Sequence, residues 1–362
     1  MKKILFILNN LEGGGAERVF VNIANGFMES NINVAFLLGE KKGVYLNLLN
    51  PAIPVTETGG TSFFHYMRAF PEIFKKAEYS HIFTATDYTS TAALLTKKFT
   101  GISSKIFVTH HYNLPGNRTL KNWKGDKIAQ IIHHYIFPSA DKIIAVSNGS
   151  LAWLRKHSNN KLSQAITIYN PVFDERIFKQ ANEKINYPVD VNGKIILVSA
   201  GRLEEQKDQL TLLKAFHILQ LKQPHFILFI LGTGPLKQLL QHYITLHHLE
   251  NDVFLMGFDT NPYKWIANCN VFVSSSISEG FGNVLAEAIA LGKTVASTNC
   301  PSGPAEILQN GALGYLCEVK NPAALAETIL QAVAKPFDGE ILKAASQQFT
   351  IREIVKKYME EL

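Results

Sequence analysis

Two glutamates that stand eight positions apart, Glu279 and Glu287, are the carboxylates best placed to take part in a reaction. They belong to the stretch SEGFGNVLAEAIALGK, in which a glycine-rich turn follows a buried strand and a helix is predicted to begin at Asn283. Glu287 then lies one turn into the helix and looks toward Glu279. Gly280 and Gly282 permit a tight turn and close approach of a ligand to the backbone. Taken one at a time, each acid also has a structural explanation: Glu279 as an acid favoured by the helix dipole near the helix start, and Glu287 as a surface acid.

A pair of cations follows an earlier apolar segment. Arg202 and Lys207 stand five positions apart in the sequence GRLEEQKD, directly after the predicted strand 194–200. Two cations at the carboxyl end of a parallel strand are suited to a diphosphate, whose negative charge is delocalised. An exposed charged turn is the alternative explanation of the same spacing.

A run of glycines follows the first predicted strand, in the sequence NNLEGGGAER. A dinucleotide fingerprint would require a third glycine where Arg18 stands, so an NAD site is not indicated. Gly14 and Gly15 still allow phosphate or sugar groups to lie close to backbone amides. A plain flexible turn is the alternative.

Two histidines, His110 and His111, stand at the end of another predicted strand, where open α/β sheets bind ligands. The register leaves either one as the candidate. The segment 117–127 that follows is basic and carries one tryptophan, which suits a pyrophosphate or anionic lipid headgroups. No nucleic-acid-binding pattern accompanies it, and an exposed loop explains it as well.

The elements that would position these residues alternate along the chain. Predicted strands in the first half are 4–8, 33–38, 81–84, 105–109, 142–146 and 166–172, and predicted helices are 16–28, 63–76, 90–100, 128–137 and 150–156. Alternation of apolar strands with helices predicts parallel sheets covered on both faces. The same alternation resumes at residue 194, so the 362 residues accommodate two α/β domains.

The composition of the chain indicates what kind of partner it binds and where it is located. The net charge of +6 is uneven, because residues 1–170 hold 19 Lys and Arg against 10 Asp and Glu, whereas residues 171–362 hold 17 against 20. A basic first half indicates an anionic partner, with a merely solvated surface as the alternative. No apolar run is long enough to span a membrane, and three cysteines without metal-ligand spacing indicate reduced thiols. We therefore expect a cytoplasmic protein, with peripheral attachment to the cytoplasmic face of a membrane.

The Glu279–Glu287 spacing and its surroundings resemble the E-x7-E signature of retaining glycosyltransferases of family 4. The segment NCPSGPAE at 299–306 is similar to members that extend polyprenyl-pyrophosphate-linked oligosaccharides or surface polysaccharides. The resemblance implies the α/β GT-B architecture, in which two Rossmann-like domains face each other across a cleft. It places the acceptor-binding domain at 1–171 and the nucleotide-sugar domain at 172–342, with a C-terminal helix at 343–362 returning to the first domain.

The resemblance also implies roles for individual residues. Glu287 would hold the ribose hydroxyls, Glu279 would orient the hexose, and Arg202 and Lys207 would stabilise the leaving diphosphate. His111, with His110 as second choice, would contact the donor sugar. The remaining implied contacts are donor contacts by Gly14, Gly15, Gly280, Phe281, Gly282, Asn283 and Val284, and acceptor contacts by Glu17 and His110. The basic segment 117–127 adds Arg118, Lys121 and Lys124 as candidate acceptor contacts.

The expected reaction is transfer of a hexose, of the N-acetylhexosamine or galactose type, to a lipid-linked saccharide or a surface polysaccharide, with retention at the anomeric carbon. The donor is expected to be a UDP-sugar, with a GDP-sugar as the alternative. No Asp-x-Asp sequence exists in the chain, so neither a metal nor another cofactor is expected at the diphosphate. A sugar-nucleotide epimerase and a non-catalytic nucleotide-sugar binding protein remain as alternatives.

Overall fold

The computed structural model describes residues 2–111, 131–223 and 225–362, and these form two compact units. One unit joins Met1–Val172 to the C-terminal segment Thr350–Leu362, and the other is Phe173–Phe349. The segment that returns to the first unit is therefore shorter than the expected 343–362. Residues 343–349 stay with the second unit because helix α13 (Gly339–Ser346) packs against α10 (Asn283–Ala290) there.

The first unit is built on a parallel sheet of seven strands in the order β3-β2-β1-β4-β5-β6-β7. The strands are β1 (Lys3–Leu8), β2 (Asn33–Leu38), β3 (Val55–Glu57), β4 (His81–Thr84), β5 (Lys105–His110), β6 (Lys142–Ala145) and β7 (Ala165–Thr167). Five of the six expected strands appear within one residue of their predicted bounds. The sixth, expected over 166–172, is shorter in the structure, where only Ala165–Thr167 form the strand β7 and pair with β6. The short edge strand β3 was not predicted.

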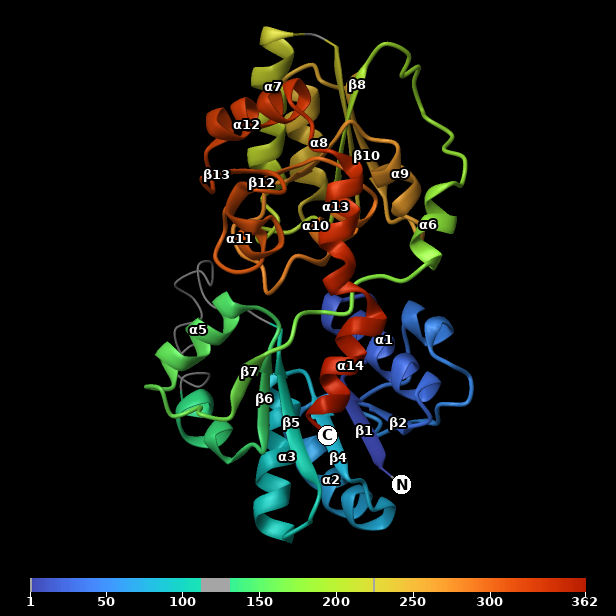
Figure 1. Ribbon diagram of the computed structural model, residues 1–362, viewed down its shortest axis with the longest axis vertical. Helices are drawn as coiled ribbons and strands as arrows, with labels where there is room; N and C mark the ends of the chain where they lie inside the picture. Colours follow the sequence, from blue (N-terminus) through green and yellow to red (C-terminus); the bar gives the residue numbers. More distant parts are fainter. Residues whose placement is uncertain (1, 112–130, 224) are drawn as a thin grey trace. The chain divides into compact units, whose positions relative to one another are not determined.

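Helices cover both faces of this sheet, because side chains along each strand alternate between faces. On β1, Ile4, Phe6 and Leu8 contact the core that contains α1 (Gly15–Glu29) and α14 (Ile351–Glu360). Leu5 and Ile7 contact the opposite core. That core is formed with α2 (Phe63–Ala77), α3 (Asp87–Thr100), the turn η3 (Ile132–Ile136) and α5 (Asn148–His157). Figure 1 shows α14 lying beside α1 on the same side of the sheet.

The second unit repeats this plan with a parallel sheet of six strands in the order β10-β9-β8-β11-β12-β13. The strands are β8 (Ile195–Ala200), β9 (Phe226–Leu231), β10 (Val253–Gly257), β11 (Val271–Ser274), β12 (Val295–Thr298) and β13 (Tyr315–Cys317). Besides α10 and α13, its helices are α6 (Arg176–Ala181), α7 (Gln209–Lys222), α8 (Lys237–Leu246), α9 (Tyr263–Ala267), α11 (Pro304–Ile307) and α12 (Pro322–Ala334). The predicted α/β class with two Rossmann-like domains is confirmed.

In each sheet the strand order reverses at one point, between β1 and β4 in the first unit and between β8 and β11 in the second. At such a switch point the loops that leave the carboxyl ends of the two strands diverge, and ligands of open α/β sheets bind between them. In the second unit these loops are 201–208, which carries Arg202 and Lys207, and 275–282, which carries Glu279. The topology thus brings together candidates that lie more than 70 residues apart in the chain.

Candidate active site

The two loops at the switch point of the second unit are joined by a series of hydrogen bonds. The Ser275 hydroxyl donates to the Lys207 carbonyl at 2.8 Å, and the Gln206 amide donates to the Ser278 carbonyl at 2.8 Å. The backbone N–H of Ile277 donates to the Gln206 carbonyl at 2.9 Å. These bonds fix the two loops against each other, so the side chains on them have defined neighbours.

Glu279 is held by two partners on these loops. Lys207 Nζ lies 2.6 Å from Glu279 Oε1, and the Ser276 hydroxyl donates to the same oxygen at 2.6 Å. The Glu279 side chain is 8% exposed and that of Lys207 is 21% exposed. The structure therefore brings together one of the predicted carboxylates and one of the predicted cations in a largely buried, charge-assisted contact.

Arg202 has a different environment from Lys207. Its guanidinium contacts Glu204 Oε1 at 2.9 Å, and its side chain is 68% exposed. Its carbonyl accepts a hydrogen bond from the Gln209 side chain, which anchors the backbone of the loop to α7. Arg202 is thus fixed by its backbone while its guanidinium lies at the surface of the second unit.

The glycine-rich turn ends in helix α10, whose N-cap is Gly282 with φ of +93°. A glycine has no side chain with which to cap the helix, so the backbone N–H groups of residues such as Asn283 and Val284 are the groups that an approaching anion meets first. The Phe281 side chain is buried and packs on the Phe349 ring at 5.4 Å. Phe281 can therefore offer a ligand its backbone, as can Gly280 and Gly282, while its ring anchors the turn.

Glu287 is buried on the second turn of α10, with 8% exposure. The hydroxyl of Tyr263, on α9, donates a hydrogen bond to Glu287 Oε1 at 3.2 Å. A buried carboxylate oriented by a hydroxyl is a hydrogen-bond acceptor in a defined position, which suits a ligand with adjacent hydroxyl groups.

Among the described residues, the Cys300 thiol is close enough to Glu279 for that charge to affect it, but it is not a reactive thiol. Burial raises the pKa of the Cys300 thiol, and the charge of Glu279 raises it further. The thiol therefore stays protonated, and all three cysteines are free.

The two candidate histidines of the first unit point to opposite faces of the sheet. The His111 ring lies 5.9 Å from that of Phe20 on α1, and its Nε2 is 2.9 Å from the Thr109 hydroxyl. The His110 ring instead stacks on Trp153 of α5 at 5.6 Å. Burial, with a smaller contribution from His110, lowers the pKa of His111 to about 3, so its imidazole is neutral at physiological pH.

Helix α1 begins at Gly15 with Gly14 as its N-cap. The Glu17 carboxylate folds back over Gly14, at a place where a side chain on residue 14 would overlap it. That carboxylate is the end of a flexible side chain and can move aside, and Gly14 has φ of −80°, so neither the contact nor the backbone requires a glycine here. The predicted acceptor contacts Arg118, Lys121 and Lys124 lie outside the described residues.

Sequence reasoning did not identify Ser276, Ser275, Gln206 or Tyr263 as parts of the site. The serine run 274–276 was visible before Glu279, but its contacts depend on the neighbouring loop. Tyr263 reaches Glu287 across 24 residues of sequence and carries no local signal.

By sequence, each of the two units matches a known protein family. Residues 13–176 match the family described as Glycosyltransferase Family 4, and residues 181–349 match Glycosyl transferases group 1. With the two Rossmann-like folds and the site at the second switch point, these matches define the class of protein. The chain belongs to the family 4/group 1 glycosyltransferases, which have the GT-B fold.

Among curated proteins, the chain is 34% identical over 214 residues to N-acetylgalactosamine-N,N'-diacetylbacillosaminyl-diphospho-undecaprenol 4-alpha-N-acetylgalactosaminyltransferase of Campylobacter jejuni. That match covers 59% of this chain and 56% of the relative. An uncharacterized glycosyltransferase of Methanocaldococcus jannaschii is 32% identical over 53% of this chain and 48% of its own. The chain thus spans about half the length of these relatives.

Among solved structures, Anabaena HepE in complex with UDP and glucose has a TM-score of 0.81 at 21% identity, covering 100% of this chain and 99% of its own. The sucrose-phosphate synthase of Thermosynechococcus elongatus has a TM-score of 0.82 at 18% identity, covering 100% and 98%. These similarities establish the fold. Within the described part of the chain, every helix is too short or too polar to cross a membrane.

Proposed function

We propose that this protein is a retaining, metal-independent glycosyltransferase that moves a hexose from a UDP-sugar to a lipid-linked saccharide or a surface polysaccharide. The observation that carries the proposal is the Lys207–Glu279 contact at the switch point of the second unit. It puts a cation and a carboxylate beside the N-terminus of α10, where a sugar diphosphate would meet both charges.

Three groups of the second unit would bind different parts of the donor. Glu287, oriented by Tyr263, would accept hydrogen bonds from the ribose hydroxyls. The amides at the start of α10 would face the diphosphate, and Glu279 would accept hydrogen bonds from hexose hydroxyls. A sugar held in this way presents its anomeric carbon in one orientation, which is the main requirement for transfer.

Departure of the nucleoside diphosphate requires compensation of its developing charge. Lys207, the exposed Arg202 guanidinium and the α10 dipole supply positive charge that is already in place. Since the chain has no Asp-x-Asp sequence, we assign this task to the protein's own cations. The departing phosphate would receive the proton of the acceptor hydroxyl.

The acceptor class is inferred from the relatives and from charge. The Campylobacter relative is named as acting on a diphospho-undecaprenol-linked saccharide. The first half of this chain is basic, and a lipid-linked acceptor lies at an anionic surface, so peripheral attachment to a membrane is part of the proposal.

The test is binding and turnover of a panel of UDP- and GDP-sugars in the presence of EDTA, for the wild type and Glu287→Ala. We expect saturable binding of one UDP-sugar and at least tenfold weaker binding to the variant, equivalent to about 1.4 kcal/mol. Glu327→Ala removes an exposed carboxylate of α12 in the same unit and serves as the matched control. Equal binding by all three proteins would exclude the assignment of Glu287.

The products formed identify the reaction that the protein catalyses. Transfer to an undecaprenyl-diphosphate-linked saccharide with an α-configured product from an α-configured donor supports the proposal. Epimerised nucleotide sugar formed from donor alone would identify an epimerase instead. Binding without transfer to lipid-linked or polysaccharide acceptors would identify a non-catalytic nucleotide-sugar binding protein. A requirement for added Mg²⁺ or Mn²⁺ would contradict the assignment of the leaving-group charge to Lys207 and Arg202.

A further inference from the structure

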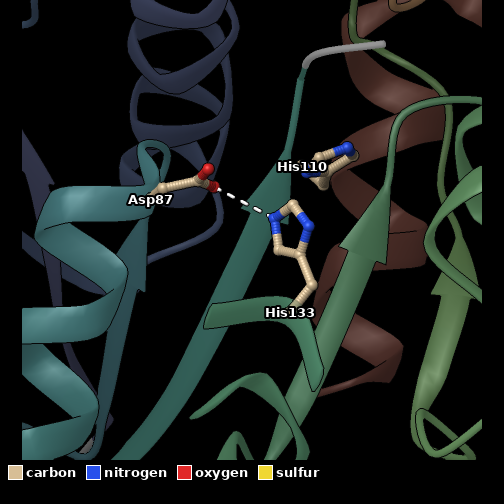
Figure 2. Close-up of side chains that lie close together, drawn as sticks. All are labelled: Asp87, His110 and His133. Carbon is tan, nitrogen blue, oxygen red and sulfur yellow. Dashed lines mark hydrogen bonds and ion pairs between the residues drawn. The ribbon is translucent and has the colours of Figure 1, made fainter. Parts of the chain in front are cut away.

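Three potential metal ligands converge in the first unit, within its described residues (Figure 2). Asp87 is the first residue of α3, His110 is the last residue of β5, and His133 lies in the turn η3. One ligand atom from each side chain lies within 4.8 Å of the other two. Both histidines are buried, with His133 at 0% exposure and His110 at 3%.

The separation of Asp87 from His133 fits two ligands of one ion. Asp87 Oδ1 lies 3.4 Å from His133 Nε2, which is long for a hydrogen bond. Ligands that each lie about 2.0–2.1 Å from a tetrahedral zinc ion are about 3.3–3.4 Å from one another. An ion bound by both atoms would therefore require almost no change in the distance between them.

His110 completes the set from the neighbouring strand. Its ring is nearly perpendicular to that of His133, at 87° and 5.6 Å between centroids. Bringing its nitrogen into coordination from the 4.8 Å limit requires a shift of about 1–1.5 Å, within the reach of a side-chain torsion.

Aromatic side chains fix both histidine rings. Trp153 stacks on His110 at an interplanar angle of 9° and meets the edge of His133 at 89°. The Phe137 ring lies 4.8 Å from that of His133. An apolar shell of this kind restricts solvent and holds ligands in place, and it supports metal affinity.

We propose that Asp87, His110 and His133 form a binding site for one divalent transition-metal ion of the zinc type. Two histidines and a carboxylate leave one position for water or another ligand. The ion would join the start of α3, the end of β5 and the η3 turn, and Asp87 and His133 are 46 residues apart in the chain. Its binding would therefore stabilise the carboxyl edge of the first sheet. All three ligands belong to the first unit, whereas Arg202, Lys207 and α10, which we propose contact the donor diphosphate, belong to the second.

The test is titration of chelator-treated protein with Co²⁺, followed by displacement with Zn²⁺. We expect one equivalent of Co²⁺ to bind, with the visible absorption of a four- or five-coordinate ion, and Zn²⁺ to abolish that absorption. Zn²⁺ should also raise the Tm of the wild type, because a ligand that binds only the folded state stabilises it. Asp87→Asn and His133→Gln should each weaken binding at least tenfold.

His134→Gln is the matched control, because His134 adjoins His133 but contacts Lys161 and Tyr135 instead. It should bind Co²⁺ as the wild type does. Circular dichroism of the metal-free proteins shows whether each variant folds, and the wild-type measurements stand without the variants. Sub-stoichiometric Co²⁺ binding by the wild type, or binding and a Tm rise that persist in Asp87→Asn and His133→Gln, would overturn the proposal.

Discussion

Lys207 and Glu279 form a 2.6 Å contact across the point where the strand order of the second unit reverses. They come from loops that follow different strands, so the contact also determines how the two loops meet. Both side chains are largely withdrawn from water, and the Ser276 hydroxyl contributes a second hydrogen bond to the same carboxylate oxygen. Under the proposed function, a donor diphosphate would compete with Glu279 for the Lys207 ammonium.

The first prediction concerns the coupling of these two charges. Lys207→Met and Glu279→Gln should each lower the free energy of unfolding by about 1–3 kcal/mol, because each leaves a poorly solvated charge without its partner. The double variant should lose less than the sum of the two single losses. Urea unfolding of the four proteins measures this coupling, and additive losses would show that the contact contributes nothing to stability.

The second prediction concerns Tyr263, which orients Glu287 by a 3.2 Å hydrogen bond. Tyr263→Phe keeps the ring and removes the hydroxyl, so we expect about 1 kcal/mol of lost stability and several-fold weaker UDP-sugar binding. Calorimetric titration with the donor measures the affinity. Tyr243→Phe, which alters a hydroxyl of α8 in the same unit, should bind the donor as the wild type does. An unchanged affinity in Tyr263→Phe would show that Glu287 needs no help from this hydroxyl.

Much of the fold could be predicted because the strands are apolar along their whole length and alternate with helices. This pattern predicts parallel sheets covered on both faces, and β1, with all but one residue buried, is an example. The edge strand β3 was missed because its three residues are partly or fully exposed and carry no apolar pattern. The division of the C-terminus was misplaced because α13 and α14 are both amphipathic, and only packing decides which unit each joins.

The site could be predicted less completely, for a related reason. Local sequence showed Lys207 after one strand and Glu279 after another, but their contact depends on strand order, which pairing alone determines. Likewise, Asp87, His110 and His133 show no metal-ligand spacing in the chain, because three different elements supply them. Residues joined by topology leave no periodic trace in the sequence.

The third prediction concerns the pH dependence of stability in the first unit. Burial, together with the nearby positive charges of Lys105 and Lys2, lowers the pKa of His81 to about 4. An unfolded histidine binds its proton near pH 6.5, so between about pH 6.5 and 4 the unfolded state binds more protons and stability falls as the pH falls. One group contributes at most about 1.4 kcal/mol per pH unit to this slope.

His81→Asn should therefore reduce the loss of stability on acidification across this window. Unfolding by urea at half-unit steps from pH 7 to about 4 measures the slope. His242→Asn, at an exposed position of α8, is the control. A slope identical in wild type and His81→Asn would mean that His81 is protonated as readily in the folded protein as in the unfolded chain.

The fourth prediction separates backbone strain from a steric contact at the glycine-rich turn. Gly303 has φ of +87°, and a side chain on it would overlap the Phe281 carbonyl. Gly311 has φ of +101° but faces open space. Gly311→Ala should thus lower stability by about 1–2 kcal/mol through strain alone. Gly303→Ala should lower it further and also weaken UDP-sugar binding, because Phe281 precedes the N-cap of α10. Thermal unfolding and donor titration of both variants test this. Equal losses of stability and unchanged donor affinity in both variants would show that the overlap with the Phe281 carbonyl has no effect beyond strain.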